Sequence, residues 1–333
     1  MISKTNQISN GVAKKILITG GAGFIGSHLA EKLLQKGEEV FVVDDLSTGS
    51  IENIKHLKDD PKFHFIRGSV LDRDLVVQTV AKVDEIYHLA AAVGVKTVIE
   101  KPLDSLLNNL RGAEMIFEIA AGKRLPVLFT STSEVYGKNE HTPFREDSDR
   151  IYGSAYNTRW GYGMSKGVDE FLALAYFREK KLPVIIVRLF NVIGPRQSGA
   201  YGMVVPRFIK QALSDKPITV YGDGCQTRCF ANVVDVVRGL INLMKHPKAR
   251  GHIFNLGSDE EITIKELAQK VKSLTGSKSE IVFVSYSEVY GPGFEDMFYR
   301  KPELSKIKET IGYQPEFSLE ESLKKIIDYS NAK

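Results

Sequence analysis

The chain has 333 residues, of which 43% are hydrophobic and 26% charged, as in a globular protein with one large core or a core and a smaller lobe. Its 45 basic and 41 acidic residues are spread along the sequence, so the net charge of +4 indicates no nucleic-acid surface. The apolar runs are too short to span a membrane, and Cys225 and Cys229 lack a second ligand pair, so we expect no membrane partner and no metal site.

Residues 1–13 are polar and lack the apolar core of a signal peptide. We expect a frayed N-terminal extension and a cytoplasmic location.

The first distinctive segment is a strand pattern that turns through glycines into a helix pattern. Residues 16–18 form a short apolar run, which is typical of a buried parallel strand. The glycines Gly20, Gly23 and Gly26 follow at once, and leucines then recur at helical spacing. Such a turn directs free N–H groups and the positive end of a helix dipole toward a ligand, which suits a pyrophosphate. We therefore predict a dinucleotide site that includes Phe24 and Ile25 of the same turn.

The next strand pattern, residues 39–43, ends at Asp44 and Asp45, about twenty residues beyond the glycines. A carboxylate at this position accepts hydrogen bonds from an adenosine ribose and repels a 2′-phosphate, so NAD is favoured over NADP. Ala90 and Ala91, after the fourth strand pattern, are small and would let the cofactor approach the backbone. Leu89, which ends that pattern, and Ser69 and Val70, which follow the third, are also predicted to bind the cofactor.

Strand and helix patterns alternate through the first half of the chain. Further strands are expected at residues 63–66, 85–89, 126–130 and 183–189, and a long amphipathic helix at residues 103–121. The alternation predicts an α/β fold with a doubly wound parallel Rossmann sheet, and ligands at the carboxyl ends of its strands.

Turns rich in glycine and proline become frequent beyond residue 191, which predicts a smaller, mixed α/β lobe. We place residues 1–190 in the NAD-binding domain and residues 191–333 in a C-terminal substrate lobe, and we expect segments of the two to interleave.

The pair Tyr162 and Lys166 is the second distinctive feature. Residues four apart on a helix share one face, and an ammonium beside a phenol lowers the pKa of the phenol, which makes a general base for a sugar hydroxyl. Thr132, where the strand at 126–130 runs into hydroxyl residues, is placed to bond to the same reacting oxygen. With NAD⁺, these groups would oxidise a secondary alcohol to a ketone.

The glycine pattern, Thr132, Tyr162 and Lys166, together with residues 88–91 and 188–196, resemble the extended short-chain dehydrogenase/reductase family, in its nucleotide-sugar epimerase and dehydratase group. The resemblance covers nearly the whole chain. It implies a nucleotide-sugar substrate and a homodimer formed through a four-helix bundle. It also implies that the nucleotide and its diphosphate bind at Asn191, Val205, Arg228 and Arg300.

Residues 132–137, Thr-Ser-Glu-Val-Tyr-Gly, are most similar to UDP-glucuronic acid decarboxylases, which implies a UDP-linked substrate. Arg159-Trp160 before the tyrosine, and Phe294-Glu295-Asp296 followed by Arg300-Lys301-Pro302, are shared with the decarboxylase half of the aminoarabinose pathway enzyme. Ser133 stands where 4,6-dehydratases carry an aspartate, which disfavours elimination of water.

The chemistry agrees with this resemblance, because a 4-keto sugar with a carboxylate at C5 is a β-keto acid that loses CO₂. Glu134 would then return a proton to C5, directly or through water, and Arg300 would pair with the substrate carboxylate or with the diphosphate. We predict a UDP-hexuronate decarboxylase. The alternatives are a nucleotide-sugar 4-epimerase, of the UDP-glucose or UDP-glucuronate type, a C5-epimerase in which Glu134 deprotonates C5, and a non-catalytic NAD(H)-binding protein.

Overall fold

The computed structural model describes residues 13–199, 202–291 and 295–332. The expected N-terminal extension therefore falls, apart from its last residue, outside the described residues. Among the helices within the described ranges, none is long and apolar enough to cross a membrane. The cytoplasmic location stays a prediction.

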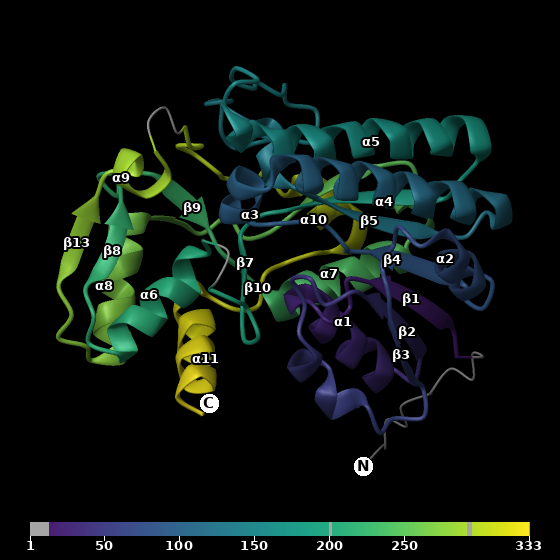
Figure 1. Ribbon diagram of the computed structural model, residues 1–333, viewed down its shortest axis with the longest axis horizontal. Helices are drawn as coiled ribbons and strands as arrows, with labels where there is room; N and C mark the ends of the chain where they lie inside the picture. Colours follow the sequence, from purple (N-terminus) through teal and green to yellow (C-terminus); the bar gives the residue numbers. More distant parts are fainter. Residues whose placement is uncertain (1–12, 200–201, 292–294, 333) are drawn as a thin grey trace, which may run out of the picture.

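A seven-stranded parallel sheet forms the centre of the molecule, in the order β11-β6-β5-β4-β1-β2-β3 (Figure 1). The strand order reverses between β1 and β4, and this reversal is where ligands bind in doubly wound sheets. Six of the strands lie within two residues of their predicted bounds. The strands are β1 (Lys15–Thr19), β2 (Glu39–Asp44), β3 (Phe63–Arg67), β4 (Glu85–His88), β5 (Val127–Thr132), β6 (Val184–Leu189) and β11 (Ile253–Leu256).

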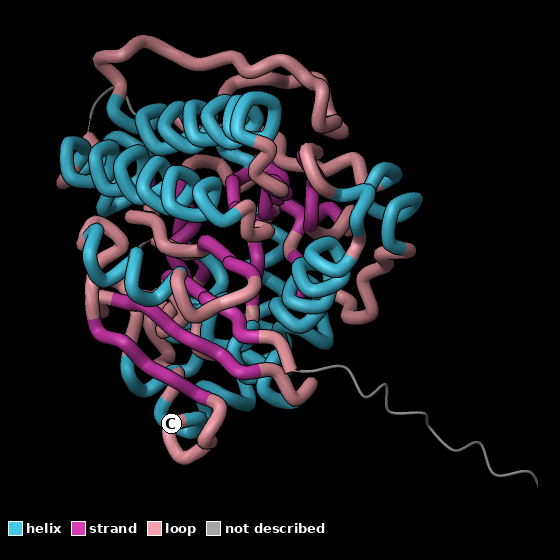
Figure 2. Tube along the Cα trace, turned by 90° about the vertical axis from the view of Figure 1, so that its right-hand side faces the viewer, coloured by secondary structure: helices cyan, strands magenta, loops and turns pink. Residues whose placement is uncertain are grey.

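Helices cover both faces of the sheet, as Figures 1 and 2 show from two directions. In β1, Ile16 and Ile18 belong to one hydrophobic core and Leu17 to the other, so the strand is buried on both sides. One face packs against α2 (Arg73–Val80), α4 (Pro102–Lys123) and α5 (Gly161–Lys180). The opposite face packs against α1 (Phe24–Gln35), α7 (Val233–Lys245) and α10 (Ser305–Ile311).

The smaller lobe has a hydrophobic core of its own and lies at one end of the sheet (Figure 1). It contains short strands in parallel and antiparallel pairs. Its helices and strands are β7 (Val192–Ile193), α6 (Val204–Leu213), β8 (Ile218–Tyr221), β9 (Thr227–Cys229), β10 (Ala231–Asn232), β12 (Glu261–Thr263), α8 (Ile264–Thr275), β13 (Ile281–Val284), α9 (Tyr286–Tyr290) and α11 (Leu319–Asn331). The remaining short helices of the chain are α3 (Val95–Glu100) and the 3₁₀ helices η1 (Ile51–Asn53), η2 (Lys55–Leu57), η3 (Ser133–Tyr136), η4 (Thr158–Trp160) and η5 (Pro247–Ala249).

The boundary at residue 190 stays a prediction. Both α7 and β11 come from beyond it, yet α7 packs on the large sheet and β11 pairs with β6. The chain therefore crosses between the two lobes more than once.

A buried ionic network fixes α5 against the sheet. Glu170 of α5 is fully buried and accepts from Arg188 of β6, with Nε–Oε1 and Nη2–Oε2 distances of 3.0 and 2.8 Å. Ser131 of β5 donates to the same carboxylate at 2.5 Å, and Arg150 pairs with it as well. Because a buried charge without partners is costly, this network holds α5 in one position along β5 and β6.

Candidate active site

A cleft of about 1210 Å³ lies at the carboxyl ends of the sheet strands and extends into the smaller lobe. Every residue singled out from the sequence as a cofactor, catalytic or substrate residue lines it, except Lys166. The fold therefore brings residues from position 20 to position 300 into one cavity, while the role of each stays a prediction. No group of three His, Cys, Asp or Glu side chains suited to a metal ion occurs in the part of the chain that the structure describes.

The glycine turn forms a cradle at the start of α1. Gly20 has φ +72°, and a Cβ there would lie 2.8 Å from the backbone nitrogen of Ala90. A Cβ on Gly26 would overlap the carbonyl oxygen of Gly20. No side chain caps the helix at Gly23, so its first N–H groups face the cleft without a side-chain acceptor. This backbone fits the pyrophosphate of a dinucleotide.

Replacing Gly26 with alanine should weaken cofactor binding and lower the free energy of unfolding by about 1–3 kcal/mol, because the new methyl group forces the turn and α1 apart. Thermal unfolding and titration with NAD⁺ measure both effects. Gly122→Ala is the matched control, because a Cβ there meets no atom within 4 Å and alanine favours the helix. Equal stability and cofactor affinity in both variants would contradict the proposed role of the turn.

Of the two acids at the end of β2, Asp44 is the better placed to bind a ribose. Its carboxylate is buried and accepts from the backbone N–H groups of Ala22 and Leu46 at 2.9 and 2.8 Å. Burial raises its pKa, and these backbone hydrogen bonds oppose that shift. Asp45 is exposed and accepts from the N–H of Ser47. The fixed position of Asp44 in the cleft fits a partner for ribose hydroxyls.

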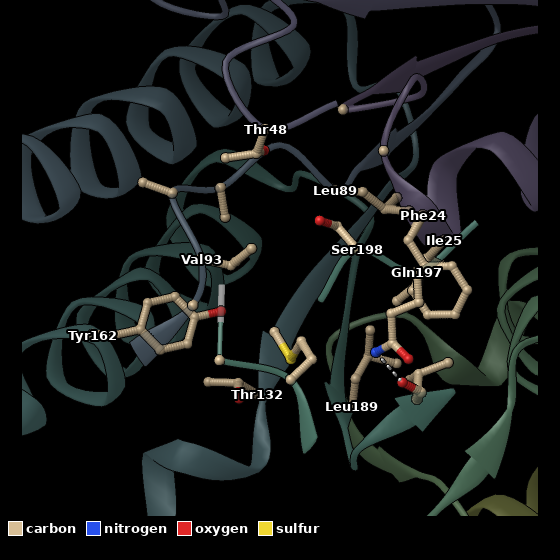
Figure 3. Close-up of a pocket in the computed structure, with 18 of the residues that line it drawn as sticks. Phe24, Ile25, Thr48, Leu89, Val93, Thr132, Tyr162, Leu189, Gln197 and Ser198 are labelled. Carbon is tan, nitrogen blue, oxygen red and sulfur yellow. Dashed lines mark hydrogen bonds between the residues drawn. The ribbon is translucent and has the colours of Figure 1, made fainter. Parts of the chain in front are cut away.

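Tyr162 and Thr132 lie together on one side of the cavity, across from the turn with Phe24 and Ile25 (Figure 3). Tyr162 is in the first turn of α5, and Thr132 ends β5. The Thr132 hydroxyl accepts from the N–H of Glu134 at 3.2 Å and donates to no protein atom among the described residues. Its proton is therefore available to a ligand oxygen.

The expectation that Lys166 lowers the pKa of Tyr162 is not met in this structure. Burial raises the pKa of the phenol, and the carboxylates of Glu134 and Asp169 raise it further. The Lys166 ammonium is buried, 3.7 Å from Asp169 and 3.9 Å from the ring centre of Phe129. Asp169, one helical turn beyond the lysine, is its partner. Tyr162 is therefore a neutral phenol here.

Glu134 lies between two arginines. Its Oε2 is 2.5 Å from Nη1 of Arg159, and its Oε1 is 2.9 Å from Nη2 of Arg300. Burial works to raise the pKa of Glu134, but the two guanidinium groups outweigh it and lower this pKa to about 2. The side chain predicted to deliver a proton is therefore an ionised carboxylate at neutral pH.

The same contacts extend to a second carboxylate. Asp296 pairs with Arg159 at 3.4 Å and with Arg228 at 3.0 Å. Three guanidinium and two carboxylate groups thus form one cluster with a net charge of +1. We call it the arginine–carboxylate cluster: Arg159, Arg228, Arg300, Glu134 and Asp296. A net positive wall beside Tyr162 suits an anionic substrate.

The sequence motifs around positions 159 and 295 are paired in space. Arg159 binds Asp296, and Nε1 of Trp160 donates to Glu295 at 2.8 Å. Phe294, quoted with this motif, lies outside the described residues. The sequence alone indicated no role for either motif, because the residues that pair are more than a hundred positions apart. Arg207, which follows Val205 and also lines the cleft, was missed altogether.

The family model described as GDP-mannose 4,6 dehydratase matches residues 17–326. The chain belongs to this family. A UDP-N-acetyl-alpha-D-glucosaminuronate decarboxylase of Bacillus cytotoxicus is 44% identical, across 95% of this chain and 97% of the relative. UDP-glucuronic acid decarboxylase 1 of Arabidopsis thaliana is 37% identical, across 98% of this chain and 73% of that protein.

Among solved structures, UDP-glucuronic acid 4-epimerase from Bacillus cereus, in complex with UDP-glucuronic acid and NAD, is similar with a TM-score of 0.86 at 32% identity. The match covers 96% of this chain and 99% of that one. The predicted family, the doubly wound fold and the assignment to a family of enzymes are therefore confirmed.

Proposed function

We propose that this member of the GDP-mannose 4,6 dehydratase family is an NAD-dependent decarboxylase of a UDP-linked hexuronate. The observation that carries the proposal is the arginine–carboxylate cluster, which places an ionised Glu134 and a net positive charge in the cleft that also contains Tyr162. The relatives from Bacillus cytotoxicus and Arabidopsis thaliana are both decarboxylases of UDP-linked uronates, which supports the same reaction.

The first step is oxidation of the C4 hydroxyl. Bound NAD⁺ would supply the hydride acceptor and a positive charge within the same cleft. Thr132 would donate to the C4 oxygen, and Tyr162 would take the hydroxyl proton. Because burial keeps the phenol neutral in this structure, Tyr162 must lose its own proton when the ligands bind. Lys166, four residues along α5, is the cation available to hold the phenolate.

The second step breaks the bond between C5 and its carboxylate. The 4-ketone accepts the electron pair, CO₂ leaves, and the resulting enolate takes one proton at C5. Since Glu134 is ionised, it would relay this proton from water rather than donate one that it already holds. In a last step C4 would take back the hydride, and O4 the proton held by Tyr162, which regenerates NAD⁺. Summed over the three steps, the reaction consumes one proton per CO₂ released.

The runner-up is epimerisation at C4. The Bacillus cereus 4-epimerase has the same fold over nearly the whole chain, and returning a hydride to the opposite face of a 4-ketone needs no proton relay at C5. Epimerisation at C5 also stays open, because an ionised Glu134 is able to take the C5 proton.

The mass of the product, measured by mass spectrometry, distinguishes decarboxylation from epimerisation. Purified protein would be incubated with NAD⁺ and either UDP-glucuronic acid or UDP-N-acetylglucosaminuronic acid. We expect a nucleotide sugar lighter by one CO₂. An unchanged mass with a new stereoisomer by NMR would overturn the decarboxylase proposal in favour of an epimerase, and no change with either compound would overturn the substrate class.

We also propose a homodimer in which α4 and α5 of two copies form a four-helix bundle. The two helices lie side by side on one face of the molecule (Figure 1). Four apolar side chains of these helices are exposed: Leu103 66%, Met164 46%, Val168 52% and Phe171 69%. Met164, Val168 and Phe171 lie on one face of α5, because they are spaced i, i+4, i+7. A large exposed apolar patch is typical of a protein–protein interface.

Analytical ultracentrifugation should give twice the chain mass for the wild type and the chain mass for Phe171→Glu, because a carboxylate in the bundle would be buried without a partner. Val77→Glu is the matched control, since Val77 is also exposed but lies on α2. A wild-type monomer, or a Phe171→Glu dimer, would contradict the proposal.

A further inference from the structure

Arg207 is half-buried, and its guanidinium group has no carboxylate partner among the described residues. It lies in the first turns of α6 and lines the cleft. Its Nε and Nη1 atoms are buried without a hydrogen-bond partner, while Nη2 donates to the carbonyl oxygen of Thr219 at 3.1 Å. Buried polar groups in proteins are nearly always paired, so two orphan donors on one side chain indicate a missing partner.

The surroundings of Arg207 hold it in place without neutralising it. Its Cζ lies 3.7 Å from the ring centre of Tyr221, which is a close cation–π contact. Burial lowers the pKa of Arg207, and the groups that oppose this shift are tyrosines: Tyr221, Tyr290 and Tyr286. A cation in such an aromatic setting gains most from an anionic ligand.

Four other arginines of the cleft and core, three of them buried and Arg300 half-buried, differ from Arg207. Each has a carboxylate oxygen within 3.0 Å: Arg159, Arg188, Arg228 and Arg300. Among the described residues, Arg207 has no such partner. Within the described ranges, Arg207 is therefore a cleft-lining guanidinium without a counter-ion.

Arg228, which the family resemblance assigns to the diphosphate, is already engaged. It binds Asp296 and donates to the carbonyl oxygens of Thr227 and Phe298. Arg300 is likewise held by Glu134 and Asn191. Arg159 and Arg300 each have one buried Nε without a partner, whereas Arg207 has two such donors and no ion pair to break among the described residues. Arg207 also lies two residues beyond Val205 in the first turn of α6, where the N–H groups of Val204 and Val205 and the helix dipole favour an anion.

We infer that Arg207 binds the diphosphate of the nucleotide-sugar substrate. The inference rests on the proposed function, because it takes the substrate to be a nucleoside diphosphate sugar. Two N–H groups and one full charge would meet the phosphate oxygens, and Tyr221 would keep the guanidinium plane fixed. The contact would be the same in the ground state and the transition state, so it would contribute to KM rather than to kcat.

Calorimetric titration of the NAD-loaded protein with UDP and with uridine tests this assignment. Arg207→Gln should weaken UDP binding by about 10- to 100-fold, as expected for a charged hydrogen-bond donor, and leave uridine binding unchanged. Arg207→Lys keeps the charge but not the planar group, so its affinity for UDP should lie between those of the wild type and Arg207→Gln. Arg145→Gln is the control, because Arg145 is an exposed arginine of the surface.

Unchanged UDP binding in Arg207→Gln would overturn the inference. An equal loss for uridine would also overturn it, because Arg207 would then contact the nucleoside. If the wild type binds GDP or dTDP instead of UDP, the proposed nucleotide is wrong, and the same variants tested with that diphosphate decide the role of Arg207. Binding of none of these diphosphates by the wild type would overturn both proposals. In steady-state kinetics, Arg207→Gln should raise KM and leave kcat nearly unchanged.

Discussion

Tyr162→Phe should lower the rate of C4 oxidation by about 10²- to 10⁴-fold, which is the usual contribution of a positioned acid–base group. The variant removes one oxygen and keeps the ring that lines the cleft beside Thr132 (Figure 3). Binding of NAD⁺ and nucleotide sugar should therefore be retained. The measurements are the rate of formation of reduced cofactor in a single turnover and the affinity for each ligand.

Tyr156→Phe is the matched control for this experiment, because Tyr156 is a fully exposed tyrosine a short distance before α5. Its activity should equal that of the wild type. Full activity of Tyr162→Phe would instead show that another group removes the C4 proton, or that the chain binds NAD(H) without oxidising a sugar.

Glu134→Gln should block the reaction after oxidation. Glutamine keeps the shape of the side chain but neither takes nor passes on a proton, and it leaves Arg159 and Arg300 without this carboxylate. Release of the decarboxylated sugar should fall by about 10²-fold or more, while reduced cofactor accumulates. Glu295→Gln is the control, because Glu295 is a nearby acid that binds Trp160 and Lys138 outside the cluster. Loss of both steps in Glu134→Gln would mean that Glu134 acts in substrate binding.

The same variant should change how stability depends on pH. The folded-state pKa of Glu134 is about 2, below its ordinary value of 4.5, so its ionisation stabilises the folded protein above pH 4.5. A shift of this size corresponds to about 3 kcal/mol, which is lost as the pH falls from 4.5 toward 2. In denaturant unfolding, the wild type should lose more stability over this interval than Glu134→Gln. Parallel pH profiles would contradict the ion pairs described for Glu134.

Much of the fold could be predicted because its signals are local. The strand at 15–19 and the glycine turn after it carry their pattern within a dozen residues, and parallel strands bring their carboxyl ends together. By contrast, β11 is a four-residue strand whose place in the large sheet depends on pairing with β6. Short apolar segments do not specify such a distant partner.

In the site, too, the features that could not be predicted are contacts between side chains that the fold brings together. Spacing placed Tyr162 and Lys166 on one face of α5, but Asp169 lies on that face too, three residues beyond the lysine, and it is the partner that the ammonium has in the structure. Likewise, Arg159 and Asp296 are 137 positions apart in the sequence, so their pairing arises only when the chain folds. Helical spacing predicts neighbours, whereas rotamers and tertiary contacts decide which neighbours interact.

The position of β11 has a consequence for the growing polypeptide. The ribosome completes β6 at Leu189, whereas the strand that covers its outer edge begins at Ile253. A nascent chain that ends between these points exposes an unpaired edge of Val and Ile residues, which is a template for pairing with another chain. Until the segment between β6 and β11 has been translated, the outer edge of β6 therefore lacks its partner strand and is open to pairing with another chain.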